Sequence, residues 1–304
     1  MLPPDRLFPA DPATRDLARK LFAEVEKLPI VSPHGHTDPR WWGENPHFSN
    51  PADLFVVPDH YVLRMLISQG VSYEALGIGE GRESDPRKIW RTFAAHFHLF
   101  QGTPSRIWVD HALSEVFGLN ERLSSKNADE QYDRIAECLA KPEFRPRELY
   151  DRFNIEVIAT TDGALDDLQW HQQALDSDWS GRVVPTYRPD AVIDPDADGF
   201  SDALDKLGEL TNCVTGTWQG YLDAHRVRRT FFREMGATAT DHGHPSPRTA
   251  NLSDSEAAAL FDRVRSGRMG DDDADLFRAQ MLTEMAKMSA EDGMVMQLHP
   301  GSWR

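Results

Sequence analysis

The chain has 304 residues, a length that α/β barrels reach as one domain, so it is long enough to bury a large core. Lys and Arg number 33 against 49 Asp and Glu, which gives a net charge of −16 at pH 7. This acidity argues against binding to nucleic acid phosphates or to an anionic membrane surface. An anionic substrate would therefore have to be bound by arginines placed within its binding site.

The chain contains two cysteines, Cys138 and Cys213, which do not form a CxxC motif. Two isolated cysteines are too few for a disulfide framework and fit a reducing compartment. The N-terminal stretch lacks the apolar region of a signal peptide, and no window approaches 18 uninterrupted apolar residues. We therefore expect a cytoplasmic protein without a membrane segment, and we also expect it to form a homo-oligomer.

The first predicted elements are a helix over residues 11–27 and a short strand. Asp11 and Pro12 are typical of a helix N-cap and first turn. The stretch PIVSPHGHTDP, residues 29–39, then places His34 and His36 two residues apart after an apolar run. Side chains two apart in a strand share a face, so both imidazoles would project together. The pair is interpreted either as a metal or proton-transfer site or as hydrogen-bonded histidines in a Gly/Pro turn.

The next region, residues 41–154, shows helical patterns and no convincing strand. The predicted helices cover residues 59–70, 85–100, 104–118, 128–139 and 147–153, most of them bounded by Gly or Pro. In the second of these, apolar residues recur near i+4, namely Ile89, Trp90, Phe93, Phe97 and Phe100. This spacing is typical of a buried helix face. The region is therefore predicted to be a helical insertion.

Strand and helix patterns alternate from Ile155 onward, which is typical of a parallel sheet. The predicted strands lie within residues 155–163, 182–190, 237–244 and 293–301. Each ends in polar residues, and parallel barrels gather their active sites at the carboxyl ends of the strands. We expect these endings to form one site together with His34 and His36; they are Thr161 and Asp162, Arg188 and Asp190, Asp241 and His242, and His299.

Six motifs in consistent order resemble uronate isomerase, a divergent family of the amidohydrolase superfamily. They are PIVSPHGHTDP, DHYVLRML at 59–66, ATTDGALDDLQWH at 159–171, PTYRPD at 185–190, TDHG at 240–243 and QLHPGSWR at 297–304. The resemblance implies a distorted (β/α)8 barrel with a helical elaboration after the first strand. It also implies interconversion of D-glucuronate with D-fructuronate and of D-galacturonate with D-tagaturonate.

The resemblance also sets the predicted domain boundaries. Residues 1–40 would hold the N-terminal helix and first barrel strand, residues 41–154 the helical insertion, and residues 155–304 the barrel β/α units. Arg304 comes directly after the expected fifth strand, whereas the family pattern continues with further strands and another aspartate. Five parallel strands would leave an open edge. We therefore expect the chain to cover about the first five strands of a longer enzyme.

Isomerisation of a uronate requires a base and a group that stabilises an enediolate. The superfamily resemblance supports His34 and His36 as ligands of one Zn2+ or similar cation, with His299 as a third ligand or a substrate contact. His60 and Tyr61 match the family's DHY motif and would act on substrate hydroxyls or the enediolate. The other interpretation of this pair is a helix cap followed by core aromatics.

The remaining candidates serve catalysis and substrate binding. Asp241 is a catalytic candidate at the fourth strand end, where dinuclear relatives often hold a bridging lysine. Arg188 would hold the uronate carboxylate through two parallel charge-assisted bonds, or would pair with Asp190 instead. Arg304 is a second carboxylate candidate. Trp42 is interpreted as a lid or sugar platform, or as buried packing.

Two rival functions remain open from the sequence. One is a metal-dependent amide or ester hydrolase, because His-x-His barrels often use a metal-bound hydroxide. The other is a non-catalytic fragment that binds a sugar acid without turning it over.

Overall fold

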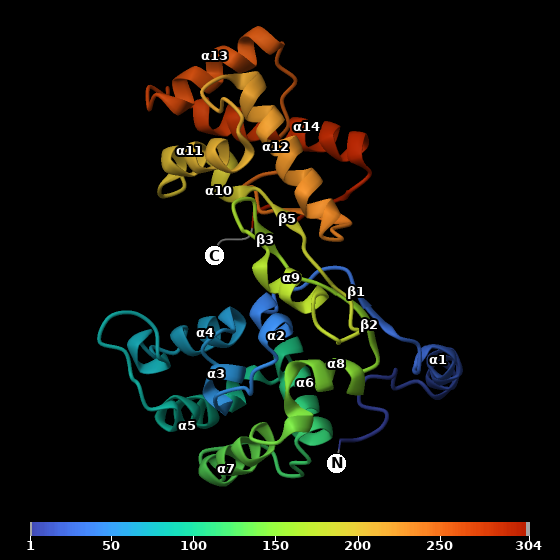
Figure 1. The fold of residues 1–304 in the computed structure, drawn as a ribbon. Coiled ribbons are helices and arrows are strands. Elements are labelled where there is room, and N and C mark those ends of the chain that lie inside the picture. The colour runs from blue at the N-terminus through green and yellow to red at the C-terminus, as the bar shows by residue number, and fades with distance from the viewer. Residues whose placement is uncertain (1, 302–304) are drawn as a thin grey trace. The chain divides into compact units, whose positions relative to one another are not determined.

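The computed structural model describes residues 2–301. The chain forms two compact units, each described here by itself (Figure 1). One combines residues 1–28 with 45–153, and the other combines 29–44 with 154–304. The predicted region 1–40 is therefore divided, because the N-terminal helix groups with the helical insertion while the first strand pairs in the other unit.

The first unit, called the helical unit, contains no strand among its described residues, as predicted. Its α-helices are α1 (Pro12–Val25), α3 (Pro51–Phe55), α4 (His60–Ile67), α5 (Pro86–His96), α6 (Pro104–His111), α7 (Ala128–Leu139) and α8 (Pro146–Arg152). Single turns η1 (Glu74–Leu76), η2 (Phe97–Phe100) and η4 (Pro142–Phe144) and the π-helical η3 (Ala112–Val116) join them. The predicted apolar face of 85–100 is buried in one hydrophobic core.

The helix starts follow from capping residues. Asp11 accepts a hydrogen bond from the Thr14 amide at 2.9 Å, with Pro12 in the first turn, so the predicted cap of α1 is confirmed. No residue of α1 is buried by the described residues. Leu21 and Phe22, for example, are exposed.

The second unit, called the strand unit, contains all seven short strands of the described chain and is parallel throughout. The strands are β1 (Ile30–Ser32), β2 (Ile155–Ala159), β3 (Asp162–Gly163), β4 (Val183–Val184), β5 (Tyr187–Arg188), β6 (Ala239–His242) and β7 (Val295–Leu298). They form two sheets, ordered β1-β2-β4 and β3-β5-β6-β7.

The two sheets are joined through shared strands. β2 continues into β3, and β4 into β5, and amide–carbonyl bonds bridge the breaks from Thr160 to Val184 and from Asp162 to Thr186. Pro185 lies at the second break and has no N–H to donate. Five parallel strand stretches therefore follow one another in chain order, which confirms the five predicted strands and the βαβ alternation.

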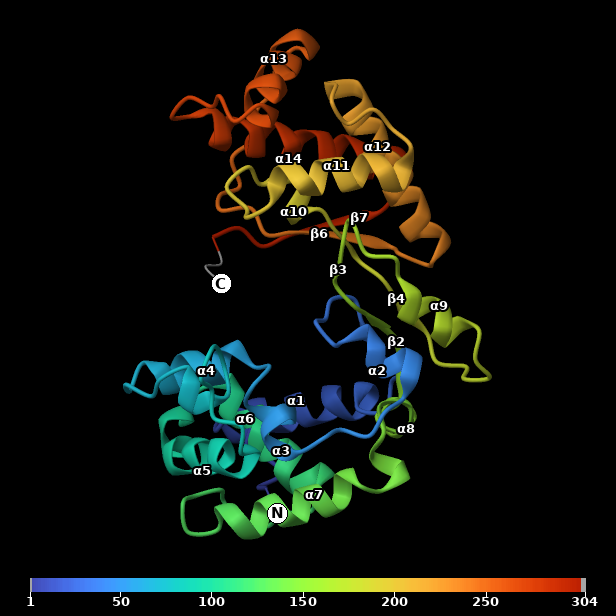
Figure 2. The same ribbon diagram turned by 60° about the vertical axis from the view of Figure 1, so that its left-hand side comes forward.

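The helices of the strand unit are α2 (Pro39–Glu44), α9 (Gln169–Leu175), α10 (Asp190–Ile193), α11 (Phe200–Thr211), α12 (Trp218–Glu234), α13 (Asp254–Arg265) and α14 (Asp273–Asp292). Figure 2 shows α11 and α14 lying over β6 and β7. A hydrophobic core fills this layer, with Tyr187, Tyr221 and Phe277 fully buried. No helix within residues 2–301 is long and apolar enough to cross a membrane.

Asparagines in the left-handed conformation stand where the chain passes between units. Asn45 has φ of 50° and Asn154 has φ of 52°, a region in which asparagine is enriched. The Asn45 side chain accepts a hydrogen bond from the Arg147 amide at 3.0 Å and donates to Glu148 at 3.2 Å. These bonds tie the two ends of the helical insertion together.

Candidate active site

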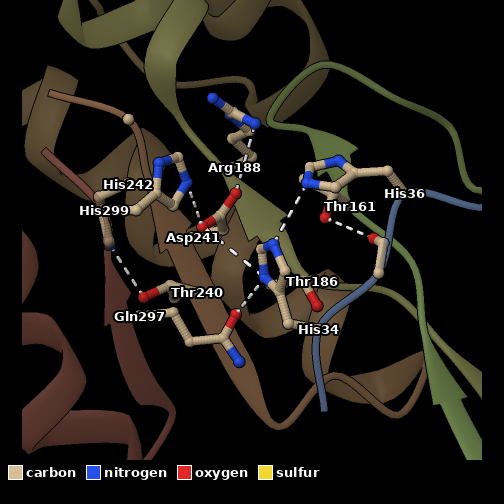
Figure 3. Close-up of polar contacts among 12 residues, drawn as sticks. His34, His36, Thr161, Thr186, Arg188, Thr240, Asp241, His242, Gln297 and His299 are labelled. Atoms are coloured by element: carbon tan, nitrogen blue, oxygen red, sulfur yellow. Dashed lines mark hydrogen bonds and ion pairs between the residues drawn. The ribbon is translucent and has the colours of Figure 1, made fainter. Parts of the chain in front are cut away.

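His34 and His36 project from the loop that follows β1, and their rings lie edge to face. Their Nε2 atoms are 3.2 Å apart (Figure 3). Two imidazole nitrogens bound to one tetrahedral Zn2+ at the usual bond length would be about 3.3 Å apart. The prediction that the two imidazoles project together is confirmed, and their spacing suits two ligands of one cation.

Gly35 separates the two histidines because the loop passes close to β2. A Cβ at this position would stand 2.9 Å from the Ala159 carbonyl oxygen. Thr161 donates a hydrogen bond to the Gly35 carbonyl at 2.8 Å. The end of β2 therefore fixes the course of the His-x-His loop and leaves no room for a side chain between the imidazoles.

Gln297 on β7 contacts the same loop, and the sequence reasoning gave it no role. Its Oε1 lies 2.8 Å from His34 Nδ1, and its Nε2 donates to the Pro33 carbonyl at 2.8 Å. Gln297 stands two residues before His299, which directly follows β7, and the alternation of a strand would place both side chains on one face. That period-two relation to His299 was the signal in the sequence that pointed to Gln297.

Asp241 on β6 lies at the centre of the charged groups. Its Oδ1 is 2.7 Å from His299 Nε2 and 3.9 Å from His34 Nδ1, and its Oδ2 is 3.4 Å from Arg188 Nη1. The Asp241 side chain is fully buried, whereas 28% of the His299 side chain is exposed. The structure therefore brings together three of the predicted strand endings and the His-x-His pair.

Arg188 is held by a second carboxylate on its other side. Its Nε donates to Asp190 Oδ2 at 2.6 Å, while Asp190 Oδ1 accepts from the Gly243 amide at 3.1 Å. A Cβ on Gly243 would stand 2.6 Å from Arg188 Nη2, so only glycine lets the backbone approach the guanidinium. The ion pair with Asp190, one of the two interpretations of Arg188, is present.

Two of the predicted strand-end residues, His242 and Asp162, make their side-chain hydrogen bonds outside this cluster. His242 is buried, lies 2.9 Å from Thr240 Oγ1, and burial lowers its pKa to about 3. Asp162 is buried too, and desolvation raises its pKa to about 6. It accepts a hydrogen bond from Thr160 Oγ1 at 2.7 Å, and Thr160 in turn lies 2.8 Å from His171 Nε2. Asp162, Thr160 and His171 thus form a buried polar network.

His60 and Tyr61 belong to the helical unit and open α4. Asp59 caps this helix by accepting hydrogen bonds from the amides of Tyr61 and Val62. The His60 and Tyr61 rings contact each other with centroids 4.2 Å apart, and 56% of Tyr61 is exposed. The helix cap is present, but Tyr61 is not a core aromatic. The catalytic role of the two residues stays a prediction.

The two remaining substrate-binding candidates are Trp42 and Arg304. Trp42 is 5% exposed, donates to Thr37 Oγ1 at 3.2 Å and stacks on Trp179 with ring centroids 6.0 Å apart. The sugar-platform prediction is therefore wrong for the described structure, since the ring is covered by packing, and the alternative of buried packing holds. Arg304 lies outside the described residues.

The prediction that His299 is a third metal ligand is not supported. Within residues 2–301, no group of three or more His, Cys, Asp or Glu side chains is arranged to hold a metal ion. His299 Nε2 faces Asp241 instead. The described residues therefore fit a cation with two ligands, His34 and His36.

The sequence pattern of the glucuronate isomerase family matches residues 12–304. The chain belongs to this family. A uronate isomerase of Rhizobium meliloti is 61% identical over all of the chain and 66% of its own length. One of Mesorhizobium japonicum is 60% identical over 99% of the chain and 65% of its own length.

Two solved structures of the family show a similar fold. The crystal structure of glucuronate isomerase from Caulobacter crescentus matches all of the chain with a TM-score of 0.96 at 52% identity. The crystal structure of uronate isomerase from Thermotoga maritima matches 99% of it with a TM-score of 0.89 at 29% identity. The chain spans 64% of each of these proteins, so it covers a little less than two thirds of its relatives' length. The α/β architecture with parallel sheets is thus shared with the glucuronate isomerase family.

Proposed function

We propose that the protein is a uronate isomerase that interconverts D-glucuronate with D-fructuronate and D-galacturonate with D-tagaturonate. The observation that carries the proposal is the contact of 2.7 Å between buried Asp241 and partly exposed His299, beside the Arg188 guanidinium. A proton-transfer group next to a carboxylate-binding group is what aldose–ketose isomerisation of a sugar acid requires. Membership of the family supports the same conclusion.

In this proposal His299, rather than Asp241, exchanges the proton with the sugar. Asp241 is fully buried, and its two oxygens face His299 and Arg188. A carboxylate in this position orients the imidazole, as in other Asp–His pairs. His299 would remove the C2 proton from the aldose and return it to C1, with the enediolate as intermediate. Asp241 is thus a positioning residue.

Arg188 is proposed to bind the uronate carboxylate. Its Nε donates to Asp190 and its Nη1 lies 3.4 Å from Asp241 Oδ2, so the substrate carboxylate would bind the outer N–H groups of the Nη1–Nη2 end. Both N–H groups at that end lie parallel, which suits the two oxygens of a carboxylate. The acidic chain would otherwise repel such a substrate.

His34 and His36 are proposed to hold one divalent cation, such as Zn2+. When bound, it would act as a Lewis acid toward a substrate oxygen. His60 and Tyr61 are proposed to contact the hydroxyls or enediolate of the substrate.

We also infer that the five parallel stretches belong to a distorted (β/α)8 barrel. Sequential parallel order with helical crossovers supports this architecture. We propose that the protein acts in the cytoplasm as a homo-oligomer in hexuronate catabolism.

The proposal is tested by incubating the purified protein with D-glucuronate in D2O. We expect formation of D-fructuronate and deuterium in the recovered uronate at C2, since the abstracted proton exchanges with solvent. Hydrolysis of amides or esters without deuterium at C2 would favour a metal-dependent hydrolase. Uronate binding by calorimetry without conversion or exchange would favour a binding protein. Either result contradicts the isomerase proposal.

A further inference from the structure

We infer that Gln297 is a positioning residue that sets which ring nitrogen of His34 carries the proton. Gln297 on β7 places its side-chain amide between the Pro33 carbonyl and the His34 ring. The functional assignments above leave this residue without a role. The inference about the proton stands on this geometry, whereas its meaning for metal binding rests on the proposed function.

The orientation of the amide follows from its two partners. The Pro33 carbonyl can only accept a hydrogen bond, and it lies 2.8 Å from Gln297 Nε2. Rotating the amide by half a turn would place two oxygens against each other at that distance. Gln297 Oε1 must therefore face His34 Nδ1, at 2.8 Å.

The His34 tautomer follows in turn. Because an amide oxygen only accepts, His34 Nδ1 must carry the proton. Asp241 Oδ1 is 3.9 Å from the same nitrogen, which is too far for a hydrogen bond, so Gln297 is the acceptor. In the neutral imidazole the lone pair is then on Nε2, which faces His36 Nε2 at 3.2 Å.

This tautomer is the one that a metal ligand needs. A ligating imidazole offers the lone pair of one nitrogen while its other N–H is held by an acceptor. In the protein without a cation, the same state of His34 can accept a hydrogen bond from His36. Gln297 thus prepares His34 for binding before a cation arrives.

Two variants separate this role from a structural one. Gln297→Glu and Gln297→Met both lose the amide that donates to Pro33, but only Gln297→Met also loses the acceptor for His34. The readout is the tautomer of His34 in long-range 15N–1H spectra of histidine-labelled protein, assigned with His34→Asn. We expect the Nδ1–H form in the wild type and in Gln297→Glu, and a mixture of both forms in Gln297→Met.

Zinc affinity, measured by competition with a chelator, gives a second readout. We expect Gln297→Met to weaken zinc binding about 10- to 100-fold, as removal of such supporting groups commonly does, and Gln297→Glu to weaken it much less. An Nε2–H tautomer in the wild type would overturn the inference without any variant. Equal loss in both variants would overturn it as well, since the Pro33 contact would then be the cause.

The experiments also distinguish failure of the proposed function from failure of the inference about Gln297. If the wild type binds no zinc or does not isomerise uronates, the metal or isomerase proposal fails. The Nδ1–H tautomer and its dependence on residue 297 would still support the inference.

Discussion

Asp190 holds Arg188 by its Nε at 2.6 Å and is itself held by the Gly243 amide at 3.1 Å. Asp241 lies 3.4 Å from the Nη1 of the same guanidinium (Figure 3). Two carboxylates thus flank one arginine, and a substrate carboxylate would have to bind against their combined negative charge. Recognition of a uronate then depends on the bidentate geometry at the Nη1–Nη2 end more than on net charge.

Replacing Arg188 by Met tests this arrangement. We expect a loss of about 2 to 5 kcal/mol in kcat/KM for glucuronate, the range for truncating one partner of a buried charge pair. Arg188→Lys should recover only part of this loss, because an ammonium lacks the planar fork. Steady-state kinetics and thermal unfolding are measured together. A folded Arg188→Met variant with wild-type kcat/KM would exclude this residue as the carboxylate anchor.

Gly243→Ala tests the close approach of the backbone just after β6 to the guanidinium of Arg188. The added methyl would stand 2.6 Å from Arg188 Nη2 and 2.7 Å from Asp190 Oδ2, so the ion pair must shift. We expect a destabilisation of about 1 to 3 kcal/mol, typical of overpacking, and a raised KM for glucuronate. Gly216→Ala is the control, since a Cβ there meets nothing within 4 Å. Equal stability and KM in both variants would contradict the expectation.

Metal binding by the His-x-His pair is tested by replacing His34 or His36 with Asn. Either change should lower the zinc content in elemental analysis, because loss of one ligand removes much of the chelate. His98→Asn serves as a control at an exposed histidine of the helical unit. If zinc stoichiometry is unchanged in both test variants, the pair is not a metal site.

The buried Asp162–His171 pair predicts opposite pH dependences. Burial raises the Asp162 pKa from 3.8 to about 6, so the native state holds a proton that the unfolded state releases, and stability falls as pH rises from 4 to 6. Burial lowers the His171 pKa from 6.5 to about 4, so the unfolded state binds the extra proton, and stability rises from pH 4 to 6.5. In the wild type the two effects offset each other.

Single variants should expose each effect. Over pH 4 to 6, relative to the wild type, the unfolding free energy of Asp162→Asn should gain a rising slope of about 1.4 kcal/mol per pH unit. Over the same pH range, the unfolding free energy of His171→Asn should gain a falling slope of similar size. Urea unfolding followed by fluorescence at low protein concentration measures both, since the sequence pI is about 5.1. Parallel slopes in the two variants would show that the pair does not titrate in this way.

The sequence predicted the elements that local patterns determine. The five strand stretches, the helical insertion and the convergence of Arg188, Asp241 and His299 all follow from periodicity and from where parallel strands end. The cap of α1 follows from Asp11 and Pro12. These features need no knowledge of distant contacts.

The features that the sequence did not predict depend on tertiary packing. Trp42 is covered by Trp179, which comes from a distant part of the chain, so the sequence alone left both the lid and the packing interpretation open. The side on which Asp162 faces is set by Thr160, Thr186 and His171. Gln297 was missed because an amide is neither an acid–base group nor a usual metal ligand; its spacing from His299 only hinted at it, and its distance from His34 reveals its role.

The bonds that join Asn45 to Arg147 and Glu148 also bear on the order of folding. These residues lie 102 and 103 positions apart in the sequence, and β1 cannot pair with β2 until the chain between them has been brought together. Closing a flexible loop of about 100 residues costs roughly 4 kcal/mol by the logarithmic rule. If the helical unit folds first, its own packing closes that loop and brings β1, which precedes the His-x-His loop, beside β2. The insertion would then act as a folding nucleus for the sheet that carries the site, and mutations in its core would slow strand pairing.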